Sequence, residues 1–369
     1  MSFSWAVTAH RTLWKGLLGL SVWAQLAFLA HAETKPGLSL SVREVSTLPG
    51  VYAGQLAFAP DGKTWAAGQQ REISLFDGDK PIRTLTPVWV DSDADLHFLA
   101  DGKKLAAGGR IYSLPDGKEL FAVSANRAVH ERGFEIDAAT ISPDFAKCVA
   151  WVKYHPSRCC RESGHRDAPA HKPASPVFVI DTQSGQTQPL PIEDGGFGEY
   201  RALAASSRYF VVGGVANKAT VFDRKTAKPA ATLSEDGAFY AFRFSADEKT
   251  LAAIHLGRFL IVYDGDRFTK RTKIEVLPDG KWLTALAISP SLPIVAVSGW
   301  DGNLRLYSLA SSDVGKLLWS GPLGQAAAIA FSPKGNELLV AVSNPNRIVR
   351  LAVSVVAGDG KRDRSLGHR

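Results

Sequence analysis

The chain has 369 residues, of which 45% are hydrophobic and 21% are charged, and its formal net charge is +7. These proportions are typical of a folded globular protein and exclude a disordered chain. The basic residues are scattered along the repeats, and the one dense run is the tail Lys361-Arg362-Asp363-Arg364, so we expect no nucleic-acid partner.

The first 32 residues have the features of a secretory signal peptide. Arg11 and Lys15 precede an apolar run over residues 16–30, and Ala30-His31-Ala32 matches a signal-peptidase site. The apolar run is shorter than the roughly 20 residues that a membrane-spanning helix needs. We therefore expect cleavage after Ala32 and a periplasmic or secreted protein without a membrane span. An uncleaved anchor is the alternative.

A repeated unit follows, and its clearest copy runs from Leu56 to Asp77. It consists of an apolar stretch, a Pro-Asp-Gly turn, a second apolar stretch, a short loop and a third stretch, which predicts three antiparallel strands. The last apolar residue before the first turn marks each copy: Phe58, Phe98, Ile141, Leu203, Phe244, Ile288 and Phe331. Most copies begin about 40–45 residues after the previous one, which is the period of a four-stranded propeller blade.

A second marker ends the third strand of most copies. It is a large apolar residue followed by Asp or Ser: Phe76-Asp77, Tyr112-Ser113, Ile180-Asp181, Phe222-Asp223, Tyr263-Asp264 and Tyr307-Ser308. The two markers lie unusually far apart in the third copy. One insertion of about 20 residues therefore explains its length, and the sequence predicts seven blades.

These repeats resemble the WD-repeat (WD40-like) family over about residues 38–357, with aromatic-Asp pairs where that family has Trp-Asp. The family's Gly-His pairs are absent, and the only Trp-Asp pair, Trp300-Asp301, falls in a loop. Exported propellers of the YVTN or TolB-like type are the alternative relatives. The resemblance implies an all-β, seven-bladed β-propeller of four-stranded antiparallel blades. We expect a signal peptide over 1–32, the propeller over 33–357 and a disordered basic tail over 358–369.

The resemblance also implies that an N-terminal strand completes the last blade. Leu38 to Val45 alternates like a strand and precedes the first copy. We expect it to pair with the segment from Ile348 to Val355, which would close the ring and remove an exposed sheet edge.

The insertion in blade three covers about residues 152–176. It contains two cysteines and three histidines, the residue types that bind zinc or copper: His155, Cys159, Cys160, His165 and His171. Adjacent cysteines chelate one ion poorly, so a polar structural loop or a partner-binding loop is the alternative to a metal site, and we expect no cofactor. Cys148 precedes the insertion in a predicted strand, where we expect a buried free thiol.

Blade connectivity assigns the loops to two faces of a propeller. The loops between second and third strands, and those between blades, share the face that we call the top. Several acidic residues and the Trp-Asp pair fall there, and we consider them candidate partner-binding residues: Asp93, Asp95, Glu131, Glu193, Asp194, Trp300 and Asp301. For the acidic residues, ordinary turn chemistry is the alternative explanation.

No nucleophile elbow, HExxH, P-loop, dinucleotide-binding or CxxCH haem motif occurs in the sequence. We therefore expect a non-catalytic protein-interaction module or scaffold that binds a protein partner through its top-face loops. The alternative is a propeller subunit of a periplasmic enzyme or electron-transfer complex that binds metal through the Cys/His-rich insertion.

Overall fold

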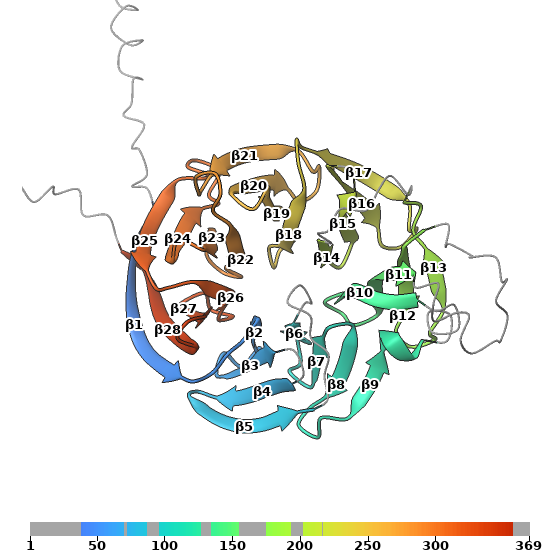
Figure 1. Cartoon of the computed structure of the whole chain (residues 1–369), viewed down its shortest axis with the longest axis horizontal. Helices are drawn as coiled ribbons and strands as arrows, with labels where there is room; N and C mark the ends of the chain where they lie inside the picture. Colours follow the sequence, from blue (N-terminus) through green and yellow to red (C-terminus); the bar gives the residue numbers. More distant parts are fainter. Residues whose placement is uncertain are drawn as a thin grey trace, which may run out of the picture. The chain divides into compact units, whose positions relative to one another are not determined.

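Seven four-stranded antiparallel sheets are arranged around a ring in the computed structural model (Figure 1). The structure describes residues 38–69, 72–86, 96–126, 134–154, 175–192, 202–215 and 217–356. They belong to one compact unit, Leu38–Gly358. The predicted seven-bladed, all-β propeller is confirmed. In the described part of the chain, no helix has the length and hydrophobicity needed to cross a membrane.

Each of the first four blades uses four consecutive strands, with the first strand innermost (Figure 1). Blade one contains β2 (Gln55–Phe58), β3 (Thr64–Gln69), β4 (Glu72–Asp77) and β5 (Lys80–Leu85). Blade two contains β6 (Leu96–Phe98), β7 (Lys104–Ala107), β8 (Arg110–Ser113) and β9 (Glu119–Ala122), followed by the short helix η1 (Val123–Ala125). Blade three contains β10 (Phe134–Ile141), β11 (Lys147–Tyr154), β12 (Val177–Asp181) and β13 (Thr187–Pro189). Blade four contains β14 (Leu203–Ala205), β15 (Tyr209–Val215), β16 (Lys218–Asp223) and β17 (Pro229–Ser234).

The last three blades follow the same plan until the chain ends. Blade five contains β18 (Phe239–Phe244), β19 (Thr250–His255), β20 (Phe259–Asp264) and β21 (Lys270–Glu275). Blade six contains β22 (Leu283–Ile288), β23 (Ile294–Gly299), β24 (Asn303–Ser308) and β25 (Leu317–Pro322). Blade seven takes three strands from the C-terminal end, β26 (Ala326–Phe331), β27 (Glu337–Val342) and β28 (Arg347–Val356), and one from the N-terminal end, β1 (Ser39–Pro49).

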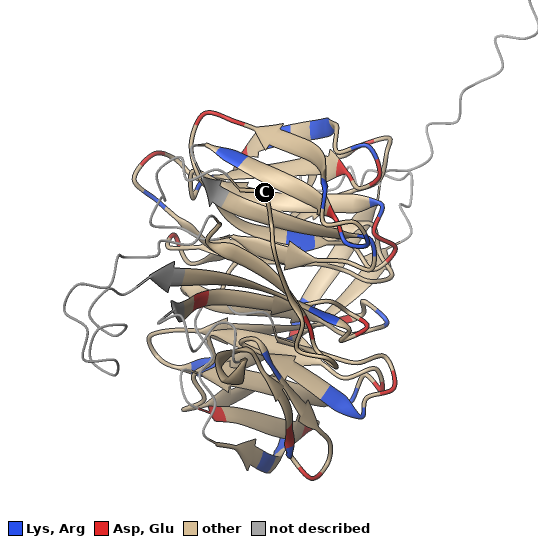
Figure 2. Ribbon diagram, turned by 90° about the vertical axis from the view of Figure 1, so that its right-hand side faces the viewer, with Lys and Arg blue, Asp and Glu red and all other residues tan. Residues whose placement is uncertain are grey.

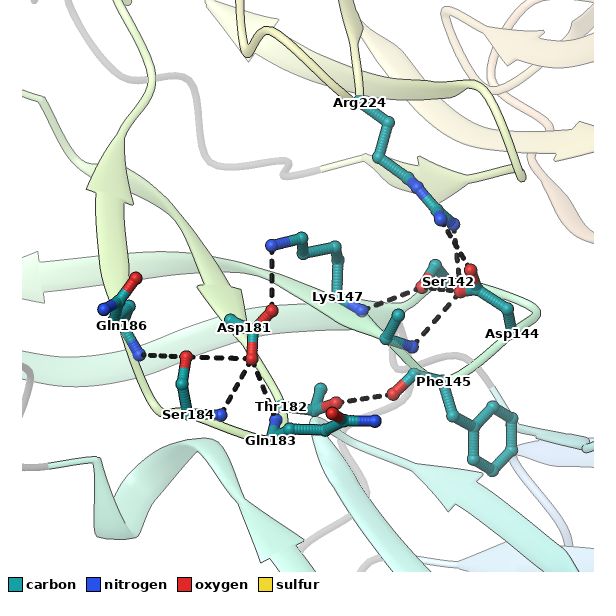
Figure 3. Close-up of polar contacts among 11 residues, drawn as sticks. Ser142, Asp144, Phe145, Lys147, Asp181, Thr182, Gln183, Ser184, Gln186 and Arg224 are labelled. Atoms are coloured by element: carbon teal, nitrogen blue, oxygen red, sulfur yellow. Dashed lines mark hydrogen bonds and ion pairs between the residues drawn. The ribbon is translucent and has the colours of Figure 1, made fainter.

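Local chemistry fixes the turn that follows the third strand in blades three, four and five. In blade three, the Asp181 carboxylate accepts hydrogen bonds from the backbone N–H groups of Gln183 (3.1 Å) and Ser184 (2.8 Å), and Lys147 Nζ lies 3.0 Å from it (Figure 3). These contacts, led by the Ser184 backbone bond, lower the pKa of Asp181. Asp223 and Asp264 accept equivalent backbone bonds in blades four and five. The repeated Asp therefore shapes a turn.

The hydrophobic core is divided among the contacts between blades. Within the described residues, each of seven clusters of buried side chains contains residues of two neighbouring blades. The cluster between blades three and four, for example, contains Trp151 on one side and Phe210 and Phe222 on the other. Because blades bury apolar surface against one another, the blades stabilise each other around the ring.

Polar contacts on the bottom face, opposite the top, add to these apolar junctions. Arg224 of blade four makes a two-pronged ion pair with Asp144 of blade three (Figure 3). Arg208 pairs with Asp266 across the next junction, and Figure 2 shows Lys and Arg beside Asp and Glu at the turns. Burial acts to raise the pKa of Asp144, but the bonds from Arg224 and Ser142 outweigh it and lower that pKa to about 2.

The ring is closed by strands from the two ends of the described chain. β1 pairs antiparallel with β28, with Leu40 opposite Val355 and Val42 opposite Val353. The register shifts between Glu44 and Ser46, and Val45 at this irregularity is 49% exposed. Leu40 is buried in the cluster between blades six and seven. The N-terminal strand therefore contributes both backbone hydrogen bonds and apolar contacts to blade seven.

We predict that Leu40→Ala lowers the free energy of unfolding by about 2–3 kcal/mol, because it removes a buried side chain from the closing blade. Val45→Ala should change it by less than about 0.5 kcal/mol, because that side chain is half exposed. Denaturant unfolding of both variants measures the difference. Equal destabilisation of the two would contradict the assigned register of β1.

Candidate functional site

Three aromatic side chains gather on the top face where blades five and six meet. Tyr240 lies in β18, Trp282 precedes β22, and Trp300 lies in the loop between β23 and β24. The Tyr240 and Trp282 ring centroids are 5.1 Å apart with planes at 79°, and those of Trp282 and Trp300 are 6.2 Å apart. We call these three residues the aromatic cluster. Trp300 is 51% exposed, so the cluster presents one half-exposed tryptophan to solvent.

Backbone contacts hold the two tryptophans in place. The Trp300 N–H donates to the carbonyl of Trp282 over 2.9 Å, which ties the loop of blade six to the segment that enters it. The Trp282 ring covers Gly257, where a Cβ atom would lie 2.3 Å from the ring. Gly257 also has a φ of +67°, which favours glycine. The position of Trp282 thus depends on glycine in the neighbouring loop of blade five.

Asp301 fixes the turn that carries Trp300. Its carboxylate accepts hydrogen bonds from the Asn303 backbone (3.2 Å) and side chain (2.9 Å), and it forms an ion pair with Arg305 in β24. The Asp301 side chain is only 19% exposed. Burial acts to raise its pKa, but the bonds from Arg305 and Asn303 outweigh burial and lower the pKa to about 2. Asp301 therefore faces the protein, while Trp300 beside it faces solvent.

The surface around the aromatic cluster carries charges of both signs. Arg258 forms ion pairs with Glu275 and with Asp279, whose side chain is 94% exposed. Leu256, which follows β19 and is 38% exposed, adds apolar area next to Gly257. An apolar centre with a polar rim is the usual composition of a protein-binding surface.

Most candidate residues from the sequence lie outside the described residues. This applies to His155, Cys159, Cys160, His165 and His171 of the insertion, and to Asp93, Asp95, Glu131, Glu193 and Asp194 of the inter-blade loops. The described loops place Trp300 on the surface and Asp301 directly below it.

Several other titratable groups are held inside the protein. Cys148 in β11 is a buried free thiol, as favoured by the sequence, and burial raises its pKa to about 12. The Glu235 carboxylate, also in a top-face loop, is bound by Lys270 and Lys273 and is 7% exposed. Among the described residues, no group of three or more His, Cys, Asp and Glu could hold a metal ion.

Sequence reasoning did not identify Tyr240, Trp282 or Leu256 as parts of this surface. Trp282 could have been identified, because the sequence places it between the fifth and sixth copies of the repeat. A residue there lies in an inter-blade loop of the top face. The proximity of the two tryptophans depends on which top-face loops are neighbours, and this is a property of the folded ring.

We predict that Asp301→Asn removes part of the stability at neutral pH, because the charged carboxylate no longer holds Arg305. The folded-state pKa of Asp301 lies below its ordinary value, so its contribution is present above about pH 4 and is lost as pH falls towards 2. The variant should lose on the order of 1–2 kcal/mol at neutral pH and little at about pH 2. Urea unfolding at several pH values measures this.

The exposed Asp279 provides the control for that experiment. Its replacement by Asn should change the unfolding free energy by less than about 0.5 kcal/mol, because exposed ion pairs contribute little. If Asp301→Asn and the wild-type protein keep the same stability difference from neutral pH to about pH 2, the assigned role of Asp301 is incorrect.

Comparison with known proteins supports the fold. Residues 272–308 match the family model described as "WD domain, G-beta repeat", and this segment contains both Trp282 and Trp300. No curated protein matches the sequence significantly.

Solved structures are similar to this chain over most of its length. The β-propeller domain of Cps50 (Swd1) from Myceliophteria thermophila superposes with a TM-score of 0.66 at 15% sequence identity, covering 85% of this chain and 100% of that domain. This likeness concerns the fold alone, because the fold hosts many different functions. The structure is therefore a seven-bladed β-propeller, and residues 272–308 in its fifth and sixth blades match one WD repeat.

Proposed function

We propose that the chain is an exported, non-catalytic interaction module that binds a protein partner through the top face of blades five and six. The observation that carries this proposal is the exposure of Trp300, which lies in a turn fixed by Asp301 and by the backbone of Trp282. Tryptophan and tyrosine are enriched among the residues that contribute most to protein binding. A surface whose aromatic groups are already fixed also loses less conformational entropy when a partner binds.

The mixed charge around the aromatic cluster supports a protein partner over a highly charged polymer. Arg258, Glu275 and Asp279 form ion pairs within the protein, so the rim has no strong excess of one sign. Such a rim supplies hydrogen bonds and specificity around an apolar contact.

Trp300→Ala tests this interaction surface, with Leu317→Ala as the matched control. Leu317 lies in β25 and is 48% exposed, so both variants remove a half-exposed apolar side chain. We predict that Trp300→Ala weakens partner binding by about 2 kcal/mol or more, roughly 30-fold in affinity, while Leu317→Ala leaves it unchanged. Proteins that bind the wild-type chain in native extract are identified first, and their affinities for each variant are then measured. Equal affinities for the two variants would contradict the proposed surface.

Export is the second part of the proposal and rests on the signal-peptide features of residues 1–32. We predict that the protein from its native host begins at Glu33, and intact-mass spectrometry measures this directly. A mature protein that retains Trp23 would indicate an uncleaved anchor.

The alternative function, a metal-binding subunit of a periplasmic enzyme or electron-transfer complex, depends on the Cys/His-rich insertion. Metal analysis of the purified chain distinguishes it from the interaction module. A stoichiometric metal that is lost on replacing His165 and Cys159 would favour the alternative, whereas metal-free protein that binds its partner favours the proposal.

A further inference from the structure

The bottom face contains a cleft between blades one and two. Its residues are distant in sequence from those of the aromatic cluster. Its cavity volume is about 610 Å³, within the roughly 300–1,000 Å³ typical of small-molecule sites. Six apolar side chains from both blades form much of its walls: Pro60, Leu75, Ile82, Phe98, Leu114 and Pro115. Ile82 is 53% exposed, so the apolar wall reaches the protein surface.

The other blade junctions provide an internal comparison, because the repeat places equivalent turns at each of them. Arg224 and Asp144 bridge the junction of blades three and four, and Arg208 and Asp266 bridge the next one. The cleft at the junction of blades five and six is smaller, about 350 Å³, and four serines and one threonine line it beside Ile288, Leu292 and Leu309. The cleft between blades one and two is therefore larger than this counterpart and has fewer hydroxyl groups in its lining.

The charges at the rim of this cleft balance. Two carboxylates, Asp61 and Asp101, and two cationic side chains, Arg83 and Lys103, line the cleft. Asp61 accepts bonds from the backbone of Lys63 and from Thr64, and the Arg83 guanidinium donates to the carbonyls of the turn in blade two. Asp61, Asp101 and Arg83 already hold the two turns, and a charged ligand would meet both signs.

We infer that this cleft is a binding site for a neutral, mainly apolar small molecule with a single hydrogen-bonding group. The walls would bury the apolar part, and the polar rim would orient the hydrogen-bonding group. This site is independent of the protein-binding surface proposed above, because the two lie on opposite faces and share no residue.

Three compounds that differ mainly in charge test this inference: cinnamyl alcohol, cinnamylamine and cinnamate. Calorimetric titration of the full chain should show saturable one-to-one binding of the alcohol, with weaker binding of the ammonium and carboxylate compounds. Absence of saturable binding of the alcohol, or binding of either charged compound about tenfold more tightly, would overturn the inference.

The repeat offers a matched pair of variants that locate the bound compound. Ala100 and Ala246 are exposed residues that precede Asp101 and Asp247, and each of these aspartates accepts a bond from the backbone of the lysine two positions later. Ala100→Trp should fill the cleft and weaken binding of cinnamyl alcohol by at least about tenfold, while Ala246→Trp leaves it unchanged. Ile82→Ser, at a half-exposed position, should weaken it by about threefold. Equal effects of the two tryptophan variants would overturn the assigned location.

Discussion

The pairing of β1 with β28 is the contact on which the closed ring depends. Blade seven takes its outer strand from the N-terminal side of the described chain, so this blade joins two segments about 300 residues apart in sequence. Closing so long a loop costs conformational entropy. A ladder of backbone hydrogen bonds and the burial of Leu40 offset that cost. Once closed, every blade has a neighbour on both sides against which its apolar side chains are buried.

Both surfaces for which we propose binding lie at junctions between blades. The aromatic cluster forms at one junction, because Trp282 enters blade six beside the blade-five loop that contains Gly257. The position of Trp300 follows from the same arrangement, through the bond between its N–H and the Trp282 carbonyl. A partner would therefore contact side chains fixed by the packing of two blades, and little ordering would accompany binding.

The sequence predicted the blades well because their strand ends are determined locally. Phe58, Phe244 and Phe331 each end a first strand, and the Asp of each aromatic-Asp pair ends a third strand. Alternating apolar residues and Asp turns act over a few positions and can be recognised without the fold. Leu203 is the exception among the first-strand markers, since it begins the three-residue strand β14.

The site could be predicted only in part, for a physical reason. Connectivity assigned Trp300 and Asp301 to the top face, and both are there. Their opposite orientations depend on Arg305, four residues after Asp301. Its ion pair with the Asp301 carboxylate keeps that group against the protein. The contact between Trp282 and Trp300 depends on two loops that meet only after blades five and six have packed. Alternation patterns describe single strands and do not encode such contacts between loops.

The approximate symmetry of the ring gives a physical criterion for locating function. Most equivalent positions are filled by groups that stabilise junctions, such as Arg224 with Asp144 and Arg208 with Asp266. A position where apolar surface is left exposed or unfilled is a candidate for another role. The half-exposed Trp300 on the top face and the apolar cleft between blades one and two on the bottom face are two such positions. Unfilled apolar space lacks packing contacts, and a bound partner or ligand would supply them at the two places where we propose binding.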